Sequence, residues 1–440
     1  MKFYNRTSEL TELERIRNLS FSDSSRLTVV TGRRRIGKTS LIMKSVENTP
    51  AVYLFVGRKN EAALCAGFIP AIAKSLDVFV PEGINTFRSL FQYLMELATN
   101  RSFNLIIDEF QEFYNINESV YSDMQNIWDS YRKKSRMNLI VSGSIYSLMQ
   151  KIFQNSKEPL FGRADNIIKL SAFDTVTLKE IIHDYYPGYT NDDLLALYTF
   201  TGGVPKYIEL LCDNEKLDVN GMIEFLVREN SSFTDEGKNL LIEEFGKNYA
   251  TYFSILSAIS GGINTQPEIE AVLGNISIGG QLKRLIEDYN IIVRQRPVLA
   301  KEGTHTVRYE IQDNFIGFWF NYFDRHRSLI EIKNFKGLQS IIKSDYPTYS
   351  GKMLERYFKQ QFAESFQYRN IGSWWEPKSG QNEIDIVALK LEKNRAVVAE
   401  VKRQKKNFKP ESLATKVEHL KHKTLPKYSI ETQCLSLEDM

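Results

Sequence analysis

A glycine-rich stretch with a lysine and a hydroxyl residue is the first part of this chain whose spacing indicates chemistry. It runs from Gly32 to Thr39 as Gly-Arg-Arg-Arg-Ile-Gly-Lys-Thr and fits G-x-x-x-x-G-K-[ST]. An apolar segment from Leu27 precedes it and a helix-compatible segment follows. A loop in this setting points backbone N–H groups at phosphates. Lys38 is expected to neutralise the β- and γ-phosphates, and the Thr39 hydroxyl is expected to ligate Mg²⁺. The context disfavours the alternative, a basic surface turn. The predicted nucleotide contacts here are Gly32, Arg33, Arg34, Arg35, Ile36, Gly37, Lys38, Thr39 and Ser40.

A second candidate site is the pair of carboxylates that ends the apolar segment 103–109. The segment predicts a buried parallel strand, and ligands of open α/β sheets lie at the carboxyl ends of such strands. Asp108 is predicted to hold the Mg²⁺ shell, and Glu109 to polarise the attacking water. An acidic pair alone is usually a solvated strand end. Behind a phosphate loop it indicates hydrolysis.

This pair resembles the Walker B element of the AAA+ superfamily of ATPases. The segment 3–10, with Arg6, resembles the N-terminal box that lies near the adenine in the origin-binding and signalling branches. Ser142 ends another apolar strand at the place of the first sensor, although it could also cap a turn. The resemblance makes Arg163 a candidate arginine finger, in cis or from a neighbouring subunit; the alternative is an ion pair with a surface acid.

Length and composition set the protein class. At 440 residues the chain is expected to hold three or four domains. With 25% charged and 42% hydrophobic residues, it has the balance of a soluble globular protein. No apolar run approaches the roughly 20 residues of a membrane span, and no N-terminal signal segment is present. Three separated cysteines, Cys65, Cys212 and Cys434, form no zinc pattern or disulfide framework. A cytoplasmic location is therefore expected.

Positive charge is concentrated near the C-terminus. Residues 390–427 hold twelve Lys and Arg against four Asp and Glu, an excess of eight. Subtracting this excess from the net charge of +3 leaves about −5 for the rest of the chain. A basic segment beside a near-neutral body favours a polyanionic partner such as DNA. The alternative is a solvated helix face.

The segment 249–322 is interpreted as a winged helix. Three short predicted helices begin near Tyr252, Gln266 and Ile278, and strands at 291–296 and 306–311 form a hairpin. Such modules often place their third helix in a DNA groove. Basic residues that could touch phosphates are Lys283, Arg284, Arg294, Arg296 and Arg308. A spacer that docks a protein partner is an equally good interpretation, because these basic residues are too few to specify a DNA sequence.

A second set of acids lies in the last hundred residues. Strands are predicted at 373–377, 383–389 and 396–402, with a helix at 412–423 and a final strand at 428–437. Because side chains alternate along strands, Asp385, Glu400 and Lys402 can converge. Carboxylates suit Mg²⁺, and a lysine beside them can orient a water or steady charge on a phosphate. The arrangement resembles the PD-(D/E)XK restriction-endonuclease-like fold, in which Glu355 matches a helix acid, although the usual proline before the first acid is missing. A cross-strand ion pair in an ordinary sheet is the alternative.

The whole chain resembles a prokaryotic family of AAA+-like ATPases with a winged helix and a restriction-endonuclease-like domain. The predicted fold is α/β: an ATPase core at 1–175 with a parallel sheet, a helical lid at 176–245, a winged helix at 246–325 and an α/β nuclease-like domain at 326–440. The resemblance implies ATP and Mg²⁺ as cofactors and an ATPase that couples nucleotide state to DNA binding or cleavage. The alternative is a nucleotide switch that recruits a protein partner, with an inactive nuclease-like domain. Assembly into a homo-oligomer is compatible with either interpretation.

Overall fold

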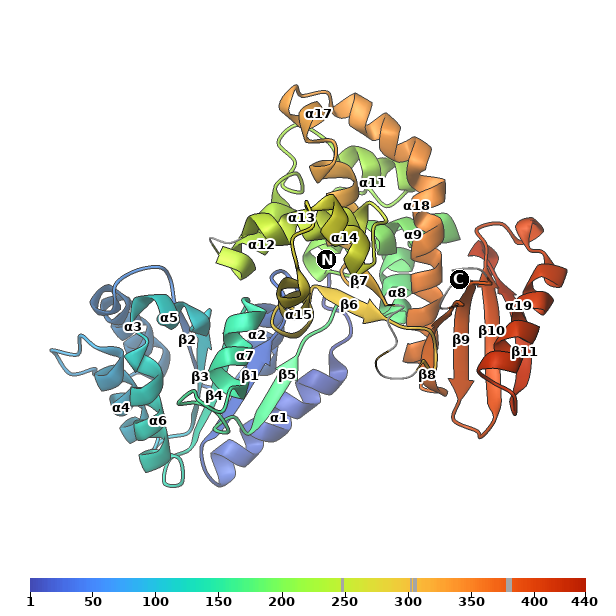
Figure 1. Ribbon diagram of the computed structural model, residues 1–440. Helices are drawn as coiled ribbons and strands as arrows, with labels where there is room; N and C mark the ends of the chain where they lie inside the picture. The colour runs from blue at the N-terminus through green and yellow to red at the C-terminus, as the bar shows by residue number, and fades with distance from the viewer. Residues whose placement is uncertain (247–248, 301–302, 304–306, 377–381) are drawn as a thin grey trace. The chain divides into compact units, whose positions relative to one another are not determined.

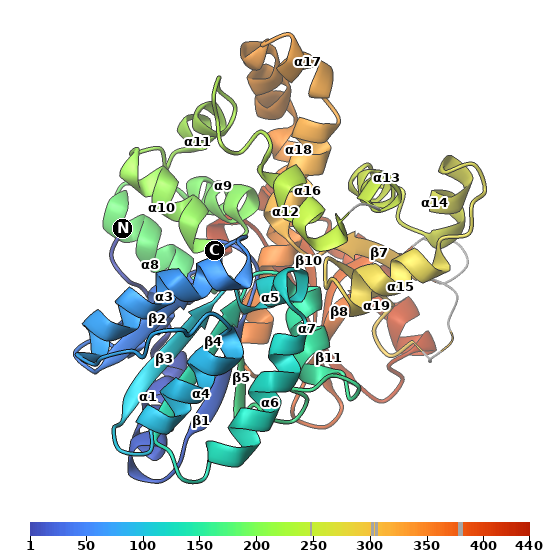
Figure 2. The same ribbon diagram turned by 90° about the vertical axis from the view of Figure 1, so that its left-hand side faces the viewer.

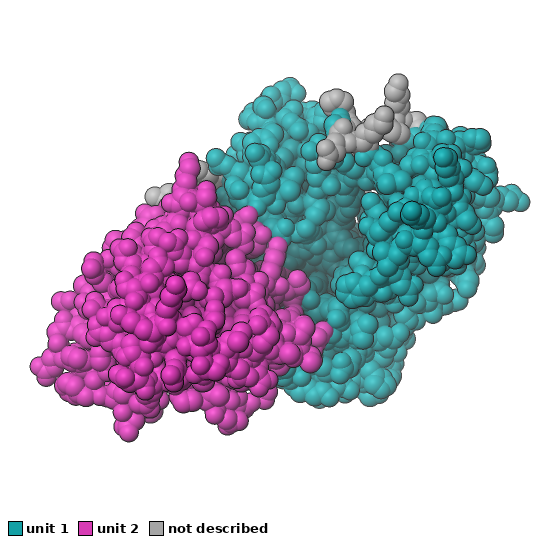
Figure 3. Space-filling model, turned by 90° about the horizontal axis from the view of Figure 1, so that it is seen from below, with its two compact units in different colours: residues 1–4, 172–440 teal, residues 5–171 magenta. Residues whose placement is uncertain are grey.

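The computed structural model describes residues 1–246, 249–300, 303, 307–376 and 382–440. The chain forms two compact units, which are coloured separately in Figure 3. One unit comprises residues 5–171, and the other comprises residues 1–4 together with 172–440. The domain boundaries at 175, 245 and 325 remain predictions. None of the helices within the described residues combines the length and hydropathy needed to span a membrane.

A five-stranded parallel sheet forms the centre of the unit 5–171 (Figure 1). The strands lie in the order β2-β3-β4-β1-β5. Their bounds are β1 (Arg26–Thr31), β2 (Ala51–Phe55), β3 (Phe103–Asp108), β4 (Met137–Gly143) and β5 (Asn166–Lys169). Every residue of β3 and β4 is buried, as expected of strands covered on both faces. The predicted parallel α/β core is confirmed.

Helices cover both faces of this sheet. Figure 2 shows α4 (Phe87–Leu97) and α6 (Ser119–Tyr131) in front of the strands and α1 (Thr7–Ser22) behind them. Alternate strand residues such as Leu105 and Ile107 belong to one hydrophobic core with residues of α4 and α6. The remaining helical segments of the unit are α2 (Lys38–Ser45), α3 (Glu61–Leu76), η1 (Phe110–Glu112), α5 (Phe113–Ile116) and α7 (Tyr146–Gln154).

The second unit begins with helices, as predicted for this segment. They are α8 (Thr175–Tyr185), α9 (Asn191–Thr201), α10 (Pro205–Asp213), α11 (Val219–Leu226) and α12 (Glu236–Phe245). A capping box between Thr190 and Asp193 begins α9. Gly202 ends α9 with a φ of 60°, and Pro205 occupies the first turn of α10. The break between α9 and α10 therefore has a local cause.

Three short helices and an antiparallel strand pair follow. They are α13 (Tyr249–Ser260), α14 (Gln266–Val272), α15 (Gly279–Glu287), β6 (Ile292–Gln295) and β7 (Arg308–Ile311). This is the element order expected for a winged helix, and the winged-helix assignment itself remains a prediction. Of the predicted strand 306–311, Thr306 lies outside the described residues.

A mixed four-stranded sheet forms the end of the chain. It has the order β11-β10-β9-β8, in which β10 pairs parallel with β11 and antiparallel with β9. Helix α18 (Phe335–Glu364) packs against this sheet and against α8 and α9 (Figure 1). The strands are β8 (Tyr368–Trp374), β9 (Ile384–Lys390), β10 (Arg395–Val401) and β11 (Ser429–Leu435). The other helical segments are α16 (Asn314–Phe318), η3 (Trp319–Asp324), α17 (Arg327–Glu331), η4 (Lys405–Asn407), α19 (Pro410–Lys423) and η5 (Leu437–Asp439).

Two details of this sheet differ from the sequence predictions. The first strand, β8, begins at Tyr368, five residues before the predicted strand 373–377, whose Pro377 lies outside the described residues. The second difference is a contact with the β6–β7 hairpin. Val298, after β6, is 4% exposed and packs in the core of the sheet with Trp374 and Ile384. Its N–H donates to the Ser373 carbonyl at 3.0 Å, so the hairpin and the sheet share one core.

Candidate functional site

The phosphate loop is closed around the ammonium group of Lys38. Gly37 caps α2 with a φ of 91°, a left-handed conformation that favours glycine. Gly32 has a φ of 151°, and a Cβ there would lie 2.8 Å from the Leu170 carbonyl oxygen. Lys38 is 7% exposed, and its Nζ donates to the carbonyls of Gly32 at 2.8 Å and Arg33 at 3.1 Å. The loop therefore holds a buried cation beside its own backbone.

The other predicted loop residues differ in exposure. Ile36 is 1% exposed and anchors the loop in the core of the unit. Arg34 and Ser40 are exposed, whereas Arg33 and Arg35 are partly buried. Arg35 has a φ of 68°, which tightens the turn before Gly37. The exposed side chains are accessible to a ligand.

Asp108, at the end of β3, is the centre of a convergent group of hydroxyls. Its Oδ2 accepts hydrogen bonds from Thr39 Oγ1 and from Tyr53 Oη, both at 2.8 Å. Its Oδ1 accepts from Ser142 Oγ at 2.5 Å and from the Glu109 N–H at 3.0 Å. Sequence reasoning identified Thr39 and Ser142 but missed Tyr53, which lies on the neighbouring strand β2.

These donors keep Asp108 ionised. Burial on its own raises the pKa of the carboxyl group, but hydrogen bonds from Ser142, Thr39 and Tyr53 hold that pKa below its ordinary value. Burial and the nearby Asp108 charge in turn raise the pKa of Tyr53. A charged carboxylate next to the Thr39 hydroxyl is the hard-oxygen donor set that Mg²⁺ takes in phosphate-loop sites, so these residues fit the ion.

Glu109 is held on the adjoining loop in an unusual backbone conformation. Its φ is 54°, which non-glycine residues rarely adopt. Its Oε2 accepts hydrogen bonds from Gln111 Nε2 at 2.6 Å and from Ser144 Oγ at 2.7 Å. The carboxylate expected to polarise water thus has two side-chain donors, Gln111 and Ser144, and sequence reasoning assigned neither of them to the site.

Arg6 lies at the same edge of the sheet as the phosphate loop. It is 7% exposed, and its Nη2 donates to the Ser171 carbonyl at 2.6 Å, just beyond the end of β5. The N–H of Leu170 bonds the carbonyl of Thr31, where β1 enters the loop. This contact places Arg6 beside the loop, as its predicted role near a nucleotide requires. Contact with adenine remains a prediction.

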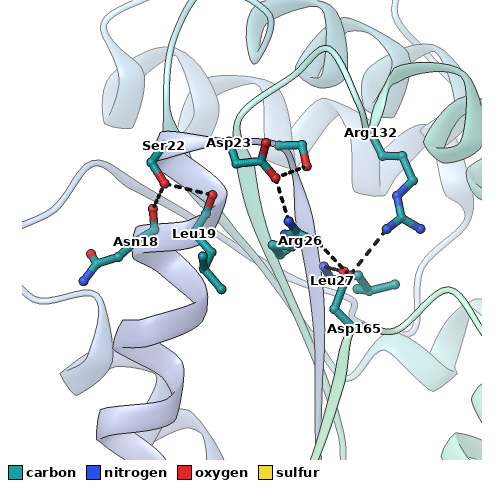
Figure 4. A network of polar contacts seen from close by, with 9 residues as sticks. Asn18, Leu19, Ser22, Asp23, Arg26, Leu27, Arg132 and Asp165 are labelled. Carbon is teal, nitrogen blue, oxygen red and sulfur yellow. Dashed lines mark hydrogen bonds and ion pairs between the residues drawn. The ribbon is translucent and has the colours of Figure 1, made fainter.

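Arg163 lies at the opposite edge of the sheet. It pairs with Asp129 at 3.1 Å, near the end of α6. Two residues later, Asp165 bonds the N–H of Leu27 and pairs with Arg26, at the start of β1 (Figure 4). The six residues of β1 separate this edge from the loop, a distance of about 20 Å at 3.3 Å per residue. A cis arginine finger is therefore wrong for this arrangement, and a contribution to a neighbouring subunit remains a prediction.

The predicted C-terminal acids converge on two adjacent strands. Ala399 of β10 pairs with Ile386 of β9, which brings the neighbouring Glu400 and Asp385 together. Asp385 Oδ2 accepts the Val401 N–H at 2.7 Å. Lys402 Nζ lies 2.9 Å from Glu400 Oε1 and 3.9 Å from Asp385 Oδ2.

Two further groups complete this cluster. Lys416 of α19 lies 3.0 Å from Glu400 Oε2, so Glu400 sits between two ammonium groups. Sequence reasoning missed Lys416. Its signal is a basic face on the helix, because His419 and Lys423 follow at helical spacing and both contact Glu376. Glu355 of α18 faces the same acids: burial first, and then the negative charge of Asp385, raise its pKa to about 7.

The C-terminal acids meet the chemical requirement for Mg²⁺ but not its geometry. Oxygen atoms of the kind that Mg²⁺ prefers are offered by Glu355, Asp385 and Glu400. Two of these acids already have partners, because a backbone N–H bonds Asp385 and two lysines contact Glu400. Within the described residues, no group of three or more His, Cys, Asp or Glu side chains is arranged to hold a metal ion. The donor set fits only if these lysines withdraw.

Two of the basic residues predicted to touch phosphates, Arg308 and Lys283, have acidic partners in the protein. Arg308 pairs with Glu383 at 2.7 Å, and its guanidinium lies 4.3 Å from the centre of the Trp375 ring. Lys283 of α15 lies 3.7 Å from Glu287 and is exposed. Arg308 therefore contributes to the junction with the C-terminal sheet.

Comparison with known sequences identifies two families along the chain. Residues 3–211 match a family described as an ATPase domain predominantly from Archaea. Residues 319–414 match a family of archaeal and bacterial proteins of unknown function. A protein of Methanocaldococcus jannaschii described as uncharacterized is 30% identical over 402 residues, which cover 89% of this chain and 86% of that protein. The similarity therefore extends through both regions.

Among solved structures, one similarity supports the fold of the chain. The Walker-type ATPase of Pyrococcus abyssi superposes with a TM-score of 0.55 at 18% identity, covering 72% of this chain and 96% of that one. An ORC2 protein of Aeropyrum pernix, in complexes with ADPNP and ADP, gives a TM-score of 0.48 at 13% identity, covering 78% of this chain and 96% of that one. The chain belongs to the archaeal-type P-loop ATPase family in which the ATPase domain is followed by this C-terminal region of unknown function.

Proposed function

We propose that this protein binds ATP with Mg²⁺ at residues 32–39 and hydrolyses it. The observation that carries the proposal is the convergence of Thr39 and Ser142 on the buried, ionised Asp108, with Glu109 beside it. Lys38 would hold the phosphates, and Asp108 with Thr39 would hold the ion. Bound Mg²⁺ supplies neutralisation of the phosphate charge. Glu109 accepts the proton of the attacking water.

Replacement of Lys38 tests this function. Binding of a fluorescent ATP analogue and release of phosphate are measured for the wild type and for Lys38→Ala. The variant is expected to lose both, because the buried ammonium group is removed from the phosphate site. The matched control is Lys44→Ala, on the same helix but half-exposed and paired with Glu47. Equal hydrolysis by the wild type and Lys38→Ala would overturn the proposal.

We further infer that the nucleotide state controls action on DNA by the C-terminal region. This is supported by direct ties within the unit that contains both α8–α9 and the C-terminal sheet. Arg403 pairs with Asp192 at 2.9 Å, and Asn191 Nδ2 donates to the Leu437 carbonyl at 2.6 Å. Lys179 donates to the carbonyl of the last residue at 3.0 Å. A shift of these helices would move the sheet with them.

The chemistry proposed for the C-terminal site is cleavage of a phosphodiester. Once Lys402 and Lys416 withdrew from Glu400, the carboxylates of Glu355, Asp385 and Glu400 would hold Mg²⁺, which would polarise the phosphate and acidify a water. Lys402 would orient that water. DNA as the substrate class is supported by the excess of eight positive charges over residues 390–427.

A nucleotide switch with a C-terminal region that only binds is the second candidate. The observation that favours it is the occupation of Glu400 by Lys402 and Lys416. Mg²⁺-dependent cleavage of plasmid and single-stranded DNA, with and without ATP, separates the two. Cleavage by the wild type that disappears in Asp385→Ala and Lys402→Ala supports a nuclease. If the wild type binds DNA but cleaves it with no metal or nucleotide tested, the result supports the switch. If the wild type neither binds nor cleaves DNA, the result points to a protein partner.

A further inference from the structure

Gln111 presents a buried polar group that the structure leaves half satisfied. The side chain is fully buried, directly after the strand that carries Asp108 and Glu109. Its Nε2 donates to Glu109 Oε2 at 2.6 Å. The amide thus turns its NH₂ group toward a carboxylate oxygen, which accepts the hydrogen bond. Its Oε1 then faces protein, where it has no hydrogen-bond partner among the described residues.

A residue that served only packing would not be an amide at this place. A buried carbonyl oxygen without a partner loses its hydration and gains nothing in return. An apolar side chain of the same shape, such as methionine, would fill the volume without that penalty. The contact that Gln111 does make is with Glu109, so that contact accounts for the amide.

The surroundings fix the amide in one position. A Cβ added to Gly143 would lie 2.3 Å from Gln111 Oε1 and 2.4 Å from the sulfur of Met149. The side chain therefore lies in a space that only glycine at the end of β4 leaves open. Ser144, the next residue, donates to the same Glu109 oxygen at 2.7 Å. Glu109 is thus held from two sides on a backbone with a φ of 54°.

We propose that Gln111 is a positioning residue for ATP hydrolysis, which acts with Ser144 by fixing Glu109 Oε2 so that Oε1 receives the proton of the attacking water. The inference rests on the proposed function of the phosphate-loop site. In the step that it serves, the water oxygen bonds to the γ-phosphorus and its proton passes to Oε1. The bond from phosphorus to the β–γ bridging oxygen breaks, and ADP leaves with that electron pair. Gln111 itself exchanges no proton.

Gln111→Met tests this role because it keeps the shape and removes both the donor and the unpaired oxygen. The expected result is a fall in kcat of about 10- to 100-fold. The fall is smaller than the whole contribution of a general base, because Glu109 itself is still present. KM for ATP stays unchanged and the melting temperature does not fall. The matched control is Gln150→Met on α7, whose Oε1 also has no partner among the described residues. That variant is expected to keep the wild-type kcat.

Two further variants identify the route of the effect. In a Glu109→Gln background, Gln111→Met should cause no further loss in single-turnover rate, because both substitutions act through one carboxylate. Ser144→Ala should lower kcat, and Ser144→Thr, which retains the hydroxyl, should restore most of it.

The outcomes separate this inference from the function on which it rests. A wild-type protein that binds ATP but never hydrolyses it would overturn both, and this is seen before any substitution. Wild-type hydrolysis with an unchanged kcat in Gln111→Met would overturn the positioning role alone. So would a loss of kcat that accompanies a lower melting temperature, or an equal further loss in the Glu109→Gln background.

Discussion

At the scale of single residues, the unit 5–171 is organised around one buried charge. Asp108 is only 4% exposed, and an unpaired carboxylate in such a place would destabilise the fold. Four donors satisfy it instead: Tyr53 on β2, Ser142 on β4, Thr39 at the start of α2 and the N–H of Glu109. Each donor stabilises the ionised form, so each contributes both to the stability of the sheet edge and to the charge available for a cation.

Tyr53 is the donor that this account adds to the group. Tyr53→Phe removes its hydrogen bond to Asp108, and we expect the free energy of unfolding to fall by about 1–3 kcal/mol. Urea denaturation followed by circular dichroism measures the change. The control is Tyr131→Phe, which removes an exposed tyrosine–carboxylate bond to Glu96 and should have the smaller effect. Equal losses in the two variants would contradict the assignment.

Glu355 carries the clearest pH signature. Its pKa of about 7 in the folded protein lies above the ordinary 4.5, so the native state keeps a proton that the unfolded state has released. Stability should therefore fall as pH rises from about 4.5 to 7. Glu355→Gln removes this dependence, and without added metal it should be more stable than the wild type above pH 7 by up to about 3 kcal/mol. Melting temperatures at pH 5 and pH 8 provide the test; a variant without gain at pH 8 would contradict it.

At the scale of elements, the β6–β7 hairpin is part of the C-terminal core. Val298→Ala should lower the free energy of unfolding by about 1–3 kcal/mol, because a buried valine is truncated. Val272→Ala, on α14 and 61% exposed, is the matched control and should be near neutral. Chemical denaturation of the full chain measures both. A neutral Val298→Ala would indicate that the hairpin is not anchored in the sheet.

The direction of the strands explains what the sequence could and could not predict. Each of three predicted site elements stands at the carboxyl end of an apolar strand: the loop 32–39, Asp108 and Ser142. Because these strands pair in parallel, the three elements meet at one end of the sheet. Arg163 precedes a strand, which places it at the amino edge, and the sequence already contained that signal. Tyr53 could not be found in advance, because its contact depends on the register between β2 and β3. The contact of Lys416 with Glu400 could not be predicted either, because it depends on how α19 packs against the sheet.

At the scale of the whole molecule, the ties between α9 and the C-terminal sheet are the proposed route of coupling. Arg403→Met removes the pair with Asp192, and Arg395→Met removes an exposed pair with Glu392 as the control. We expect the first variant to keep ATP hydrolysis and to lose the effect of ATP on DNA binding, measured by fluorescence anisotropy. The control should behave as the wild type. If Arg403→Met retained the full ATP effect, the coupling would follow another route.

The central claim is that the site around Asp108 and Glu109 hydrolyses ATP. The measurement that tests it most directly is phosphate release with Mg²⁺ by the wild type and by Glu109→Gln, together with ATP affinity for each. The account predicts equal affinity and a rate in Glu109→Gln at least about 100-fold lower, because the carboxylate that accepts the proton is gone. Equal rates in the two proteins, or no release by the wild type, would contradict it.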